Sequence, residues 1–433
     1  LSPYGHTNPL VVADLLDVAA AVMWMDRRSP RPRNYGQFRQ LRGWVRRFDV
    51  TLGVRTPEVW NRPPVKECIE QLLGWLTEDT WQIRFVRQSV RRLSDVRPAL
   101  FSSPPTDTLV VLYSGGLDSL AGVVKLLYTH PEKSVMLVSA VSPRLSGILK
   151  NQTAKLQGIF GQERVQCAPL SFHLLHDTPQ HGEEQSQRTR GFLFLSFGVA
   201  EAFAYNASRV ISCENGVGML NLPFNKRQLG AQHTRAMHPR TIVEMSDLLS
   251  LLGLAAVRCE APYLALTKAE VCTELREMEL GELCALTISC DSFPLRIPPN
   301  PYAPEREWHC GECTSCLLRR QALFAAHLEA HDPDFMYQYD VCSPPPGSGN
   351  RRLEPLKMML DQVTLIKNAC TSFKPELNLL LTFPELLTAR LAIERAPNDF
   401  GLPQRIDSME VFVRLFRQYT KEWDLFPYQL ESV

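Results

Sequence analysis

Apolar runs alternate with amphipathic segments through the middle of this chain, between residue 107 and about residue 339. Five short apolar runs predict buried strands: LVVLY, SVMLVSAV, VQCAPLSF, RVISC and AVRCEAPY. Segments with a helical period lie between them, at 118–128, 146–160, 191–206 and 240–252. This order is typical of a parallel sheet whose strands are joined by crossover helices. We therefore predict an α/β fold with a parallel, doubly wound sheet.

Two further segments flank this region, separated from it by the Pro- and Ser-rich stretches SSPPTDT at 102–108 and SPPPGSGN at 343–350. Residues 1–101 combine a helical pattern at 9–25 with strand-like runs at 47–53 and 80–87 around a helix at 65–77, which predicts an N-terminal α+β accessory domain. Residues 351–433 predict a helical C-terminal extension. The expected domains are therefore 1–101, 107–339 and 351–433.

Composition excludes some classes of function. The 433 residues contain 47 Lys and Arg against 46 Asp and Glu, so no overall field draws the chain to nucleic acid or to an anionic membrane. No apolar window approaches the roughly 18 residues of a spanning helix, and the first residues lack a secretory signal pattern, so we expect a cytoplasmic protein. In that compartment, 12 cysteines favour metal ligation by some of them over disulfides.

The stretch LVVLYSGGLDSLAGVVKLL, at 109–127, changes from a buried strand to a helix at two glycines. Such a turn aims backbone N–H groups and the positive end of a helix dipole at one point, where an anion binds. Ser114 and Ser119 add hydroxyl donors, Gly115 and Gly116 let phosphate oxygens approach the backbone, and Asp118 can hold Mg2+. The alternative is a plain strand-to-helix turn with an N-cap.

The segment S-G-G-L-D-S resembles the pyrophosphate (PP) loop of the ATP pyrophosphatases of the adenine nucleotide alpha-hydrolase type. It is not a Walker loop, which needs Gly-x-x-x-x-Gly-Lys-Ser/Thr. The resemblance implies that ATP is cut between its α and β phosphates and that AMP is handed to an oxygen of the substrate. The residues it implies for ATP binding are Tyr113, Ser114, Gly115, Gly116, Leu117, Asp118 and Ser119.

Four cysteines form the second signal. Cys310, Cys313 and Cys316 follow one another at three-residue spacing, and Cys290 lies upstream in the same polar segment. Four thiolates around one Zn2+ make a closed tetrahedral structural site, which leaves no position for a catalytic water. A redox C-x-x-C pair and an iron–sulfur cluster are the alternatives on spacing alone.

A PP-loop joined to T-x-S-C and C-G-x-C-x-x-C-x-x-R, here within 287–319, resembles the 7-cyano-7-deazaguanine synthase (QueC) family. APYLALTKAEVC and RGFLFLSFGVAEAFA resemble two further segments of that family, with Gly191 in place of its Asn. Thr267 and Glu270 also form a predicted capping box, which places Lys268 in the first turn of a helix, where it can meet a phosphate. Arg190 would open another anion-facing helix. A solvated lysine and a surface arginine are the alternatives.

The resemblance covers roughly 107–330 and departs at the family's acidic substrate segment, which CENGVGMLNLPFNKRQLGAQHTRAMHPR replaces. Here Glu214 and Asn215 follow a strand at the carboxyl edge of the sheet and are candidates to bind a base edge. His233, Arg235 and His238 are candidates for a carboxylate or the leaving phosphate. The alternative is a turn at Asn215-Gly216 and surface histidines.

The unmatched flanks resemble those of the longer, QatC-like proteins of bacterial anti-phage defence clusters. These resemblances imply adenylation of 7-carboxy-7-deazaguanine with MgATP and transfer of the acyl group to nitrogen. The acceptor is either ammonia, as in nitrile biosynthesis, or an amine of a protein partner from the same operon. The alternative from another class is an ATP-binding regulatory protein without turnover.

Residues 27–47 are rich in arginine and also contain Tyr35 and Trp44. This run predicts either a nucleic-acid surface or a solvated or protein-binding face, and the neutral balance of the chain favours the second. Its arginines are Arg27, Arg28, Arg31, Arg33, Arg39, Arg42, Arg46 and Arg47.

Overall fold

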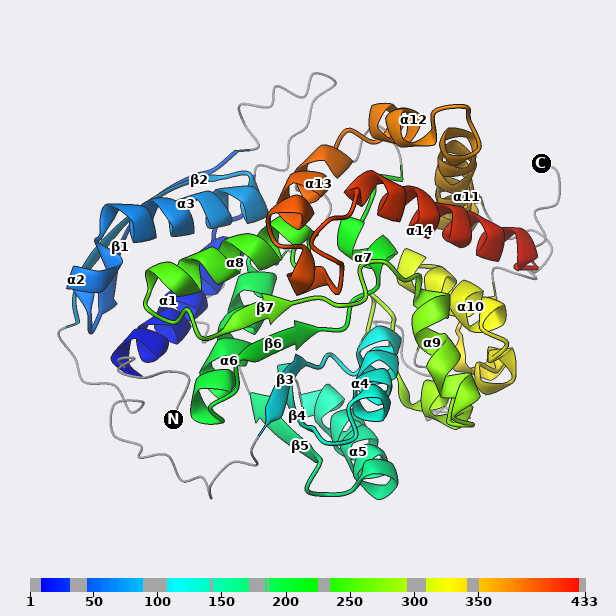
Figure 1. Cartoon of the computed structure of the whole chain (residues 1–433), viewed down its shortest axis with the longest axis horizontal. Coiled ribbons are helices and arrows are strands. Elements are labelled where there is room, and N and C mark those ends of the chain that lie inside the picture. Colours follow the sequence, from blue (N-terminus) through cyan, green and yellow to red (C-terminus); the bar gives the residue numbers. More distant parts are fainter. Residues whose placement is uncertain are drawn as a thin grey trace.

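A five-stranded, wholly parallel sheet is the centre of the computed structural model (Figure 1). The structure describes residues 9–31, 45–88, 107–140, 143–170, 184, 187–224, 234–293, 309–340 and 350–427. The strands are β3 (Thr108–Leu112), β4 (Ser134–Ala140), β5 (Val165–Leu170), β6 (Arg209–Ser212) and β7 (Arg258–Glu260). Their order across the sheet is β5-β4-β3-β6-β7. The predicted parallel α/β fold is confirmed.

The sheet reverses its winding direction between β3 and β6. From β3 the chain moves outward to β4 and β5, and it then returns to the other side of β3 to form β6 and β7. Because the crossovers on the two sides diverge there, the ligand crevice of an open α/β sheet is expected beyond the carboxyl ends of β3 and β6.

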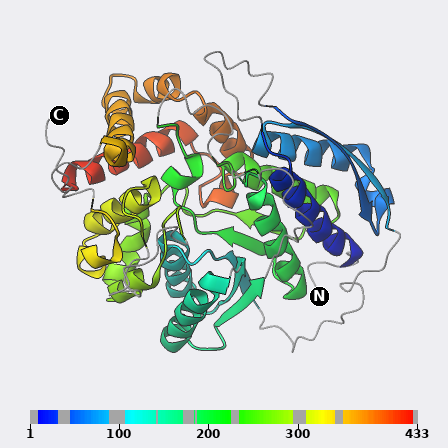
Figure 2. The same cartoon turned by 180° about the vertical axis from the view of Figure 1, so that it is seen from behind.

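Alternate residues of β3 pack into two different hydrophobic clusters, which explains its unbroken apolar run. Val110 and Leu112 face the cluster that contains α6 (Arg190–Ala204) and α8 (Pro239–Leu251). Leu109 and Val111 face the cluster that contains α4 (Leu117–Thr129), α5 (Pro143–Phe160), α9 (Lys268–Glu277) and α10 (Thr314–Ala325). Helices therefore cover both faces of the sheet, as the view from behind also shows (Figure 2).

The N-terminal segment forms a second, smaller sheet. Its elements are α1 (Pro9–Arg28), β1 (Arg47–Val54), α2 (Pro57–Trp60), α3 (Pro63–Thr77) and β2 (Thr80–Arg87). Strands β1 and β2 pair in parallel, and α3 is the crossover between them. The predicted strands and helices of this segment are confirmed. Its buried side chains belong to the same hydrophobic cluster as α6 and α8, and α1 packs on α6 while α3 packs on α8, so this segment lies on the helices that cover one face of the central sheet.

Two members of the arginine-rich run are buried rather than solvated. Arg31 binds both carboxylate oxygens of Asp79 at 2.9 Å. Arg46 reaches Asp79 and Asp26, each at 2.6 Å, and Asp26 also accepts a hydrogen bond from the Thr189 hydroxyl at 3.0 Å. Asp26, which Arg46 also binds, therefore links the N-terminal segment to Thr189 at the start of α6. The candidates Arg33, Tyr35, Arg39, Arg42 and Trp44 lie outside the described residues.

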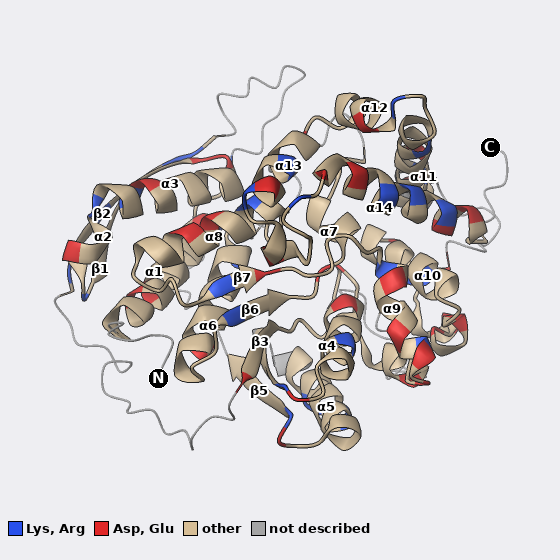
Figure 3. Cartoon of the chain, in the orientation of Figure 1, with Lys and Arg blue, Asp and Glu red and all other residues tan. Residues whose placement is uncertain are grey.

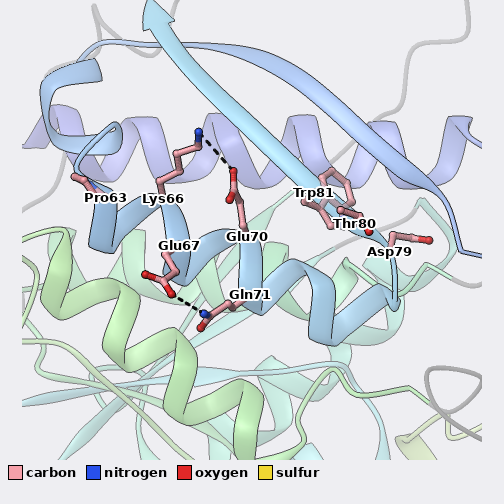
Figure 4. Close-up of a pocket in the computed structure, with 8 residues that line it drawn as sticks. All are labelled: Pro63, Lys66, Glu67, Glu70, Gln71, Asp79, Thr80 and Trp81. Carbon is pink, nitrogen blue, oxygen red and sulfur yellow. Dashed lines mark hydrogen bonds and ion pairs between the residues drawn. The ribbon is translucent and has the colours of Figure 1, made fainter.

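A groove of about 580 Å³ lies between α3 and β2 (Figure 4). Its polar side chains pair with one another, Gln71 with Glu67 at 3.1 Å and Lys66 with Glu70 at 3.9 Å. The lining residues are Pro63, Lys66, Glu67, Glu70, Gln71, Asp79, Thr80 and Trp81. None of the candidate site residues of the central region lines it.

The C-terminal segment is helical, as the sequence predicts. It contains α11 (Asn350–Cys370), α12 (Pro375–Thr382), α13 (Leu386–Arg395) and α14 (Ser408–Leu425). Helix α14 packs against the other three and against α10, and it lies beside α7 (Gly216–Leu220), the short helix after β6 (Figure 1). Short 3-10 helices complete the chain: η4 (Gly281–Leu286), η5 (Glu329–His331), η6 (Asp334–Met336) and η7 (Pro397–Phe400).

Basic and acidic residues are interspersed over the elements (Figure 3), consistent with the balanced composition. Among the described helices, none combines the length and apolar character that a membrane crossing requires.

Candidate functional site

The loop between β3 and α4 has a backbone that only glycine adopts easily. Gly115 has a φ of +78°, and a Cβ there would lie 2.9 Å from Cδ2 of Leu149. Gly116 follows as the N-cap residue of α4. The first glycine is therefore required by conformation and space, and the loop leaves the N–H groups at the start of α4 unpaired within the helix.

Two hydroxyls converge inside this loop. Ser114 Oγ accepts a hydrogen bond from the Gly116 N–H at 3.2 Å and lies 3.2 Å from Ser119 Oγ. The Ser119 hydroxyl also donates to the Gly116 carbonyl at 2.9 Å. Together with the N-terminus of α4, these groups provide hydrogen-bond donors and a positive helix end, the combination that binds phosphate.

Gln152 of α5 fixes the start of the loop from behind. Its amide oxygen accepts a hydrogen bond from the buried Tyr113 hydroxyl at 2.7 Å, and its amide nitrogen donates to the Gly115 carbonyl at 3.0 Å. The same nitrogen donates to the Leu286 carbonyl at 2.7 Å. Gln152 belongs to no sequence motif, and a fully buried amide on an amphipathic helix is visible only once the packing is known.

Asp118 meets Lys268 at the mouth of the loop, although 150 positions separate them in the chain. Lys268 Nζ lies 2.6 Å from Asp118 Oδ2, and both side chains are largely buried. The predicted capping box at Thr267 and Glu270 is present, and it starts α9 with Lys268 as the first helical residue. Burial opposes the charge of Lys268, but the neighbouring Asp118 and Glu214 outweigh it and raise the lysine pKa.

Glu214 and Asn215 lie at the end of β6, across the crevice from the loop. Asn215 Nδ2 donates to Asp118 Oδ1 at 3.0 Å, and its Oδ1 caps α7 by accepting from the Gly218 N–H at 3.1 Å. Burial, together with the Asp118 charge, raises the pKa of Glu214 to about 7, against the opposing effect of Lys268. The structure therefore gathers two carboxyl groups, one amide and one ammonium at the switch point of the sheet.

The four predicted cysteines come together before α10 and in its first turn. Their sulfur atoms all lie within 4.8 Å of one another. The Cys310 N–H also points at Cys290 Sγ, at 3.3 Å. Hydrogen bonds from the other three thiols lower the pKa of Cys310. Four sulfur donors at this separation fit a tetrahedral Zn2+ site, which supports a structural metal.

The cysteine cluster abuts the loop through the two residues before Cys290. The Ile288 N–H donates to the Gly115 carbonyl at 3.1 Å, and the Leu117 N–H points at Ser289 Oγ at 3.4 Å. Ser289 was not singled out in the sequence, although it lies inside the T-x-S-C motif. The segment that leads into the cysteine cluster therefore forms one wall of the loop.

Arg319 supports that wall from the interior. It is fully buried, pairs with Asp332 at 2.9 Å and donates to the Cys284 carbonyl at 2.8 Å. Burial disfavours its charge, yet the Asp332 carboxylate overcomes this and raises the arginine pKa. Arg319, the last residue of the C-x-x-R motif, therefore forms a structural ion pair and holds the chain just before Thr287 in place.

The remaining candidates have other partners. Arg190 opens α6, and its guanidinium lies 5.0 Å from the centre of the Phe194 ring. Arg235 stacks on the Trp75 ring at 3.9 Å and pairs with Glu78 at 2.8 Å, which holds it against the end of α3.

Of the two candidate histidines, the described one, His238, has a structural role in α8. His238 is the N-cap of α8, and burial, with help from two nearby arginines, lowers its pKa to about 3, so it is neutral. His233 lies outside the described residues.

Comparisons with known proteins support the resemblance to QueC at the family level. A family model described as queuosine biosynthesis protein QueC matches residues 187–327. A 7-cyano-7-deazaguanine synthase of Methylobacillus flagellatus is 25% identical over 236 residues, which are 51% of this chain and 92% of that protein. The family match contains Glu214, Asn215, Lys268 and the four cysteines, and it ends before α11. This part of the chain is therefore similar to QueC proteins, and the C-terminal helices lie beyond the match.

Proposed function

We propose that this protein is an ATP-dependent ligase that adenylates the carboxylate of 7-carboxy-7-deazaguanine, or of a similar base, and transfers the acyl group to nitrogen. One observation carries the proposal: the loop at 114–119, Lys268 and the wall formed by the cysteine cluster meet at the switch point of a parallel sheet. The similarity to QueC supports an ATP-dependent synthase of the 7-deazaguanine type. The loop, Lys268 and the segment before the cysteine cluster lie together at the switch point of the sheet.

In the first step a carboxylate oxygen of the substrate attacks the α-phosphorus of ATP, and the bond to the β-phosphate oxygen breaks. Pyrophosphate leaves with the electron pair. Ser114, Ser119 and the N–H groups at the start of α4 bind the departing phosphates, and Lys268 balances the charge that develops on them. Their fixed positions supply much of the effect, because the donors need not reorganise during the reaction.

A magnesium ion fits this site because Asp118 offers a hard carboxylate oxygen beside the phosphate-binding loop. When bound, the ion neutralises phosphate charge and orients the triphosphate. Asn215 and Lys268 hold the Asp118 carboxylate in place through its two oxygens, at 3.0 and 2.6 Å.

In the second step a nitrogen lone pair attacks the acyl carbon of the adenylate, the acyl–oxygen bond of this mixed anhydride breaks, AMP leaves with the electron pair, and the nitrogen loses a proton. We assign Glu214 and Asn215 to the base edge, because they lie across the crevice from the loop. Arg235 and His233 remain candidates for the substrate carboxylate; Arg235 has the protein partners described above, and His233 lies outside the described residues.

We further propose that the acceptor is an amine of a partner protein in an anti-phage defence system. The N- and C-terminal segments support this, because both lie outside the residues that match the QueC family model and add surface on which a partner protein can bind. If the acceptor is instead ammonia, the product is the amide, and a second ATP-dependent dehydration yields the nitrile of 7-cyano-7-deazaguanine.

Pyrophosphate release by the full chain with the 7-carboxy base and MgATP tests this proposal. Asp118→Asn and Lys268→Ala should each reduce the rate by at least about 100-fold, as removal of a transition-state charge contact does. Lys125→Ala is the matched control, because Lys125 of α4 pairs with Glu274 and should leave the rate nearly unchanged. Base-dependent release that survives Lys268→Ala would refute the assignment.

The alternative of an ATP-binding regulator without turnover is separated by the same assay. Such a protein binds nucleotide but releases no pyrophosphate with any base. The intact set of Ser114, Asp118, Ser119 and Lys268 supports turnover, since the two serine hydroxyls lie together and Lys268 lies beside Asp118.

A further inference from the structure

Helix α14 contacts both residues of the capping box at the start of α9, Thr267 and Glu270. The Thr267 hydroxyl donates to Glu422 Oε1 at 2.7 Å. Arg414 binds both carboxylate oxygens of Glu270, one of them at 2.8 Å, and also donates to the Ala265 carbonyl at 2.5 Å. The capping box is therefore clamped from outside the central domain by Arg414 and Glu422 of the C-terminal segment.

The clamp is built into the packing. Thr267 and Glu422 are both buried, at 0% and 3% exposure, so their contact is shielded from water. Glu422 also accepts from Gln418 Nε2 at 3.0 Å, one turn earlier on the same helix. The rest of α14 is anchored by large side chains, among them Phe412, Phe416 and Trp423, which are almost completely buried.

The same helix braces the opposite wall of the crevice. Gly216, the first residue of α7, directly follows Glu214 and Asn215, and its N–H donates to the Leu266 carbonyl at 2.9 Å. A Cβ on Gly216 would lie 1.9 Å from the Leu264 carbonyl oxygen and 2.8 Å from Cδ2 of Leu415 on α14. Both walls of the crevice thus meet at the segment before Thr267, and α14 packs on that junction.

We propose that α14 is a positioning element of the active site, in which Arg414 and Glu422 hold the capping box so that Lys268 stays at the mouth of the phosphate-binding loop. This inference rests on the proposed function. Lys268 is the first residue of α9, so its backbone position is set by the cap and not by the body of the helix. In that position the Lys268 ammonium lies 2.6 Å from Asp118 Oδ2.

The C-terminal segment is therefore part of the catalytic unit. Helix α14 lies beyond the part of the chain that resembles QueC, and it also packs against α11, α12 and α13. A ligand or partner that moves these helices would reach Lys268 through α14, which gives the C-terminal extension a mechanical connection to nucleotide binding.

The test is a double-mutant cycle between Arg414→Ala and Lys268→Ala in the full chain, read as the Kd of a nonhydrolysable ATP analogue measured by calorimetry. Because Arg414 acts through Lys268, Arg414→Ala should weaken binding about fivefold to tenfold in the otherwise unaltered chain and less than about twofold when Lys268 is already alanine. Arg414→Lys, which keeps one contact to Glu270, should retain most of the affinity.

Asp424→Asn is the matched control on the same helix. Asp424 pairs with Lys367 at 2.8 Å, and both side chains are about half exposed, at 51% and 48%. Its replacement should leave the Kd within about twofold, because Asp424 pairs with Lys367 of α11 and not with the capping box. Glu422→Ala gives a second, independent variant, in which the buried Thr267 hydroxyl loses its acceptor and the affinity should fall in the same Lys268-dependent way.

Equal losses in the two backgrounds would overturn the inference, because they would show a general effect of α14 on the fold. Unchanged affinity in both Arg414→Ala and Glu422→Ala would overturn it as well. If the unaltered chain binds no ATP analogue, the proposed function itself fails and this inference falls with it. The two failures are thus distinguishable.

Discussion

The buried carboxyl of Glu422 should make the stability of this protein depend on pH in a way that a single substitution removes. Glu422 lies on α14 with 3% exposure, accepts hydrogen bonds from Thr267 and Gln418, and has one oxygen, Oε2, without a partner among the described residues. Burial raises its pKa from 4.5 to about 7, although these hydrogen bonds oppose the shift. Folding therefore favours the protonated carboxyl.

The sign and size follow from linkage. An acid whose pKa is higher in the folded chain contributes no penalty below its unfolded pKa, and it lowers stability as the pH rises toward its folded pKa. Between pH 4 and pH 8 the change from 4.5 to about 7 corresponds to about 3 kcal/mol of lost stability. Glu422→Gln keeps the shape and an acceptor oxygen but cannot ionise, so the variant should not lose this stability as the pH rises.

The assay is urea unfolding of both proteins at several pH values from 4 to 8. Other titrating groups, such as Glu214, are present in both and cancel in the difference. The free energy of unfolding of Glu422→Gln minus that of the unaltered chain should rise by about 3 kcal/mol across this range, mostly between pH 4.5 and pH 7. Asp424→Asn, in an exposed position on the same helix, should show a flat difference. A flat difference for Glu422→Gln would refute the argument that Glu422 is buried and protonated.

Three further changes follow from the fold and the cysteine cluster. Cys313→Ser should lose the bound zinc and melt several degrees lower, as measured by metal analysis and calorimetry; full zinc content with an unchanged Tm would speak against a four-thiolate site. Gly115→Ala should cost about 1 to 2 kcal/mol in urea unfolding because its φ is left-handed, and unchanged stability would count against the loop geometry. Asp79→Asn should destabilise the chain by about 3 kcal/mol because Arg31 and Arg46 lose a buried carboxylate, and a loss below about 1 kcal/mol would contradict their burial.

Strands and helices of the central domain were predictable because each follows from a local pattern. The apolar runs of β3, β4 and β6 are buried on both faces by helices, so they show no alternation. The exception is β7, where the predicted run at 256–263 pairs only over Arg258–Glu260. The next N–H, of Ala261, donates instead to the Asp399 carbonyl at 2.7 Å, and Pro262 has no N–H to donate.

The arginine-rich run shows where a local pattern is insufficient. A dense series of arginines favours a solvated or protein-binding face, but Arg31 and Arg46 are buried. Their partners Asp26 and Asp79 are provided by two different elements, and Asp79 is 33 positions away from Arg46. Such pairing is decided by tertiary packing, which the local sequence does not contain.

The candidate site, too, was predictable from local patterns only in part. The capping box gave the position of Lys268 on its helix, and the loop motif gave Asp118, so both could be named from the sequence. That they meet at 2.6 Å follows from the sheet topology. Arg414 and Glu422 belong to no motif, since an amphipathic helix predicts only which face is buried and not which residues of another segment that face contacts.

Mass spectrometry of the products from the full chain, MgATP and 7-carboxy-7-deazaguanine tests the central claim most directly. The predicted result is AMP and pyrophosphate in equal amounts, formed only when the base is present. The base should appear as its primary amide when ammonia is the acceptor, or joined by an amide bond to an added partner protein. ATP that stays intact with the base, or that is cleaved to ADP and phosphate, would contradict the claim.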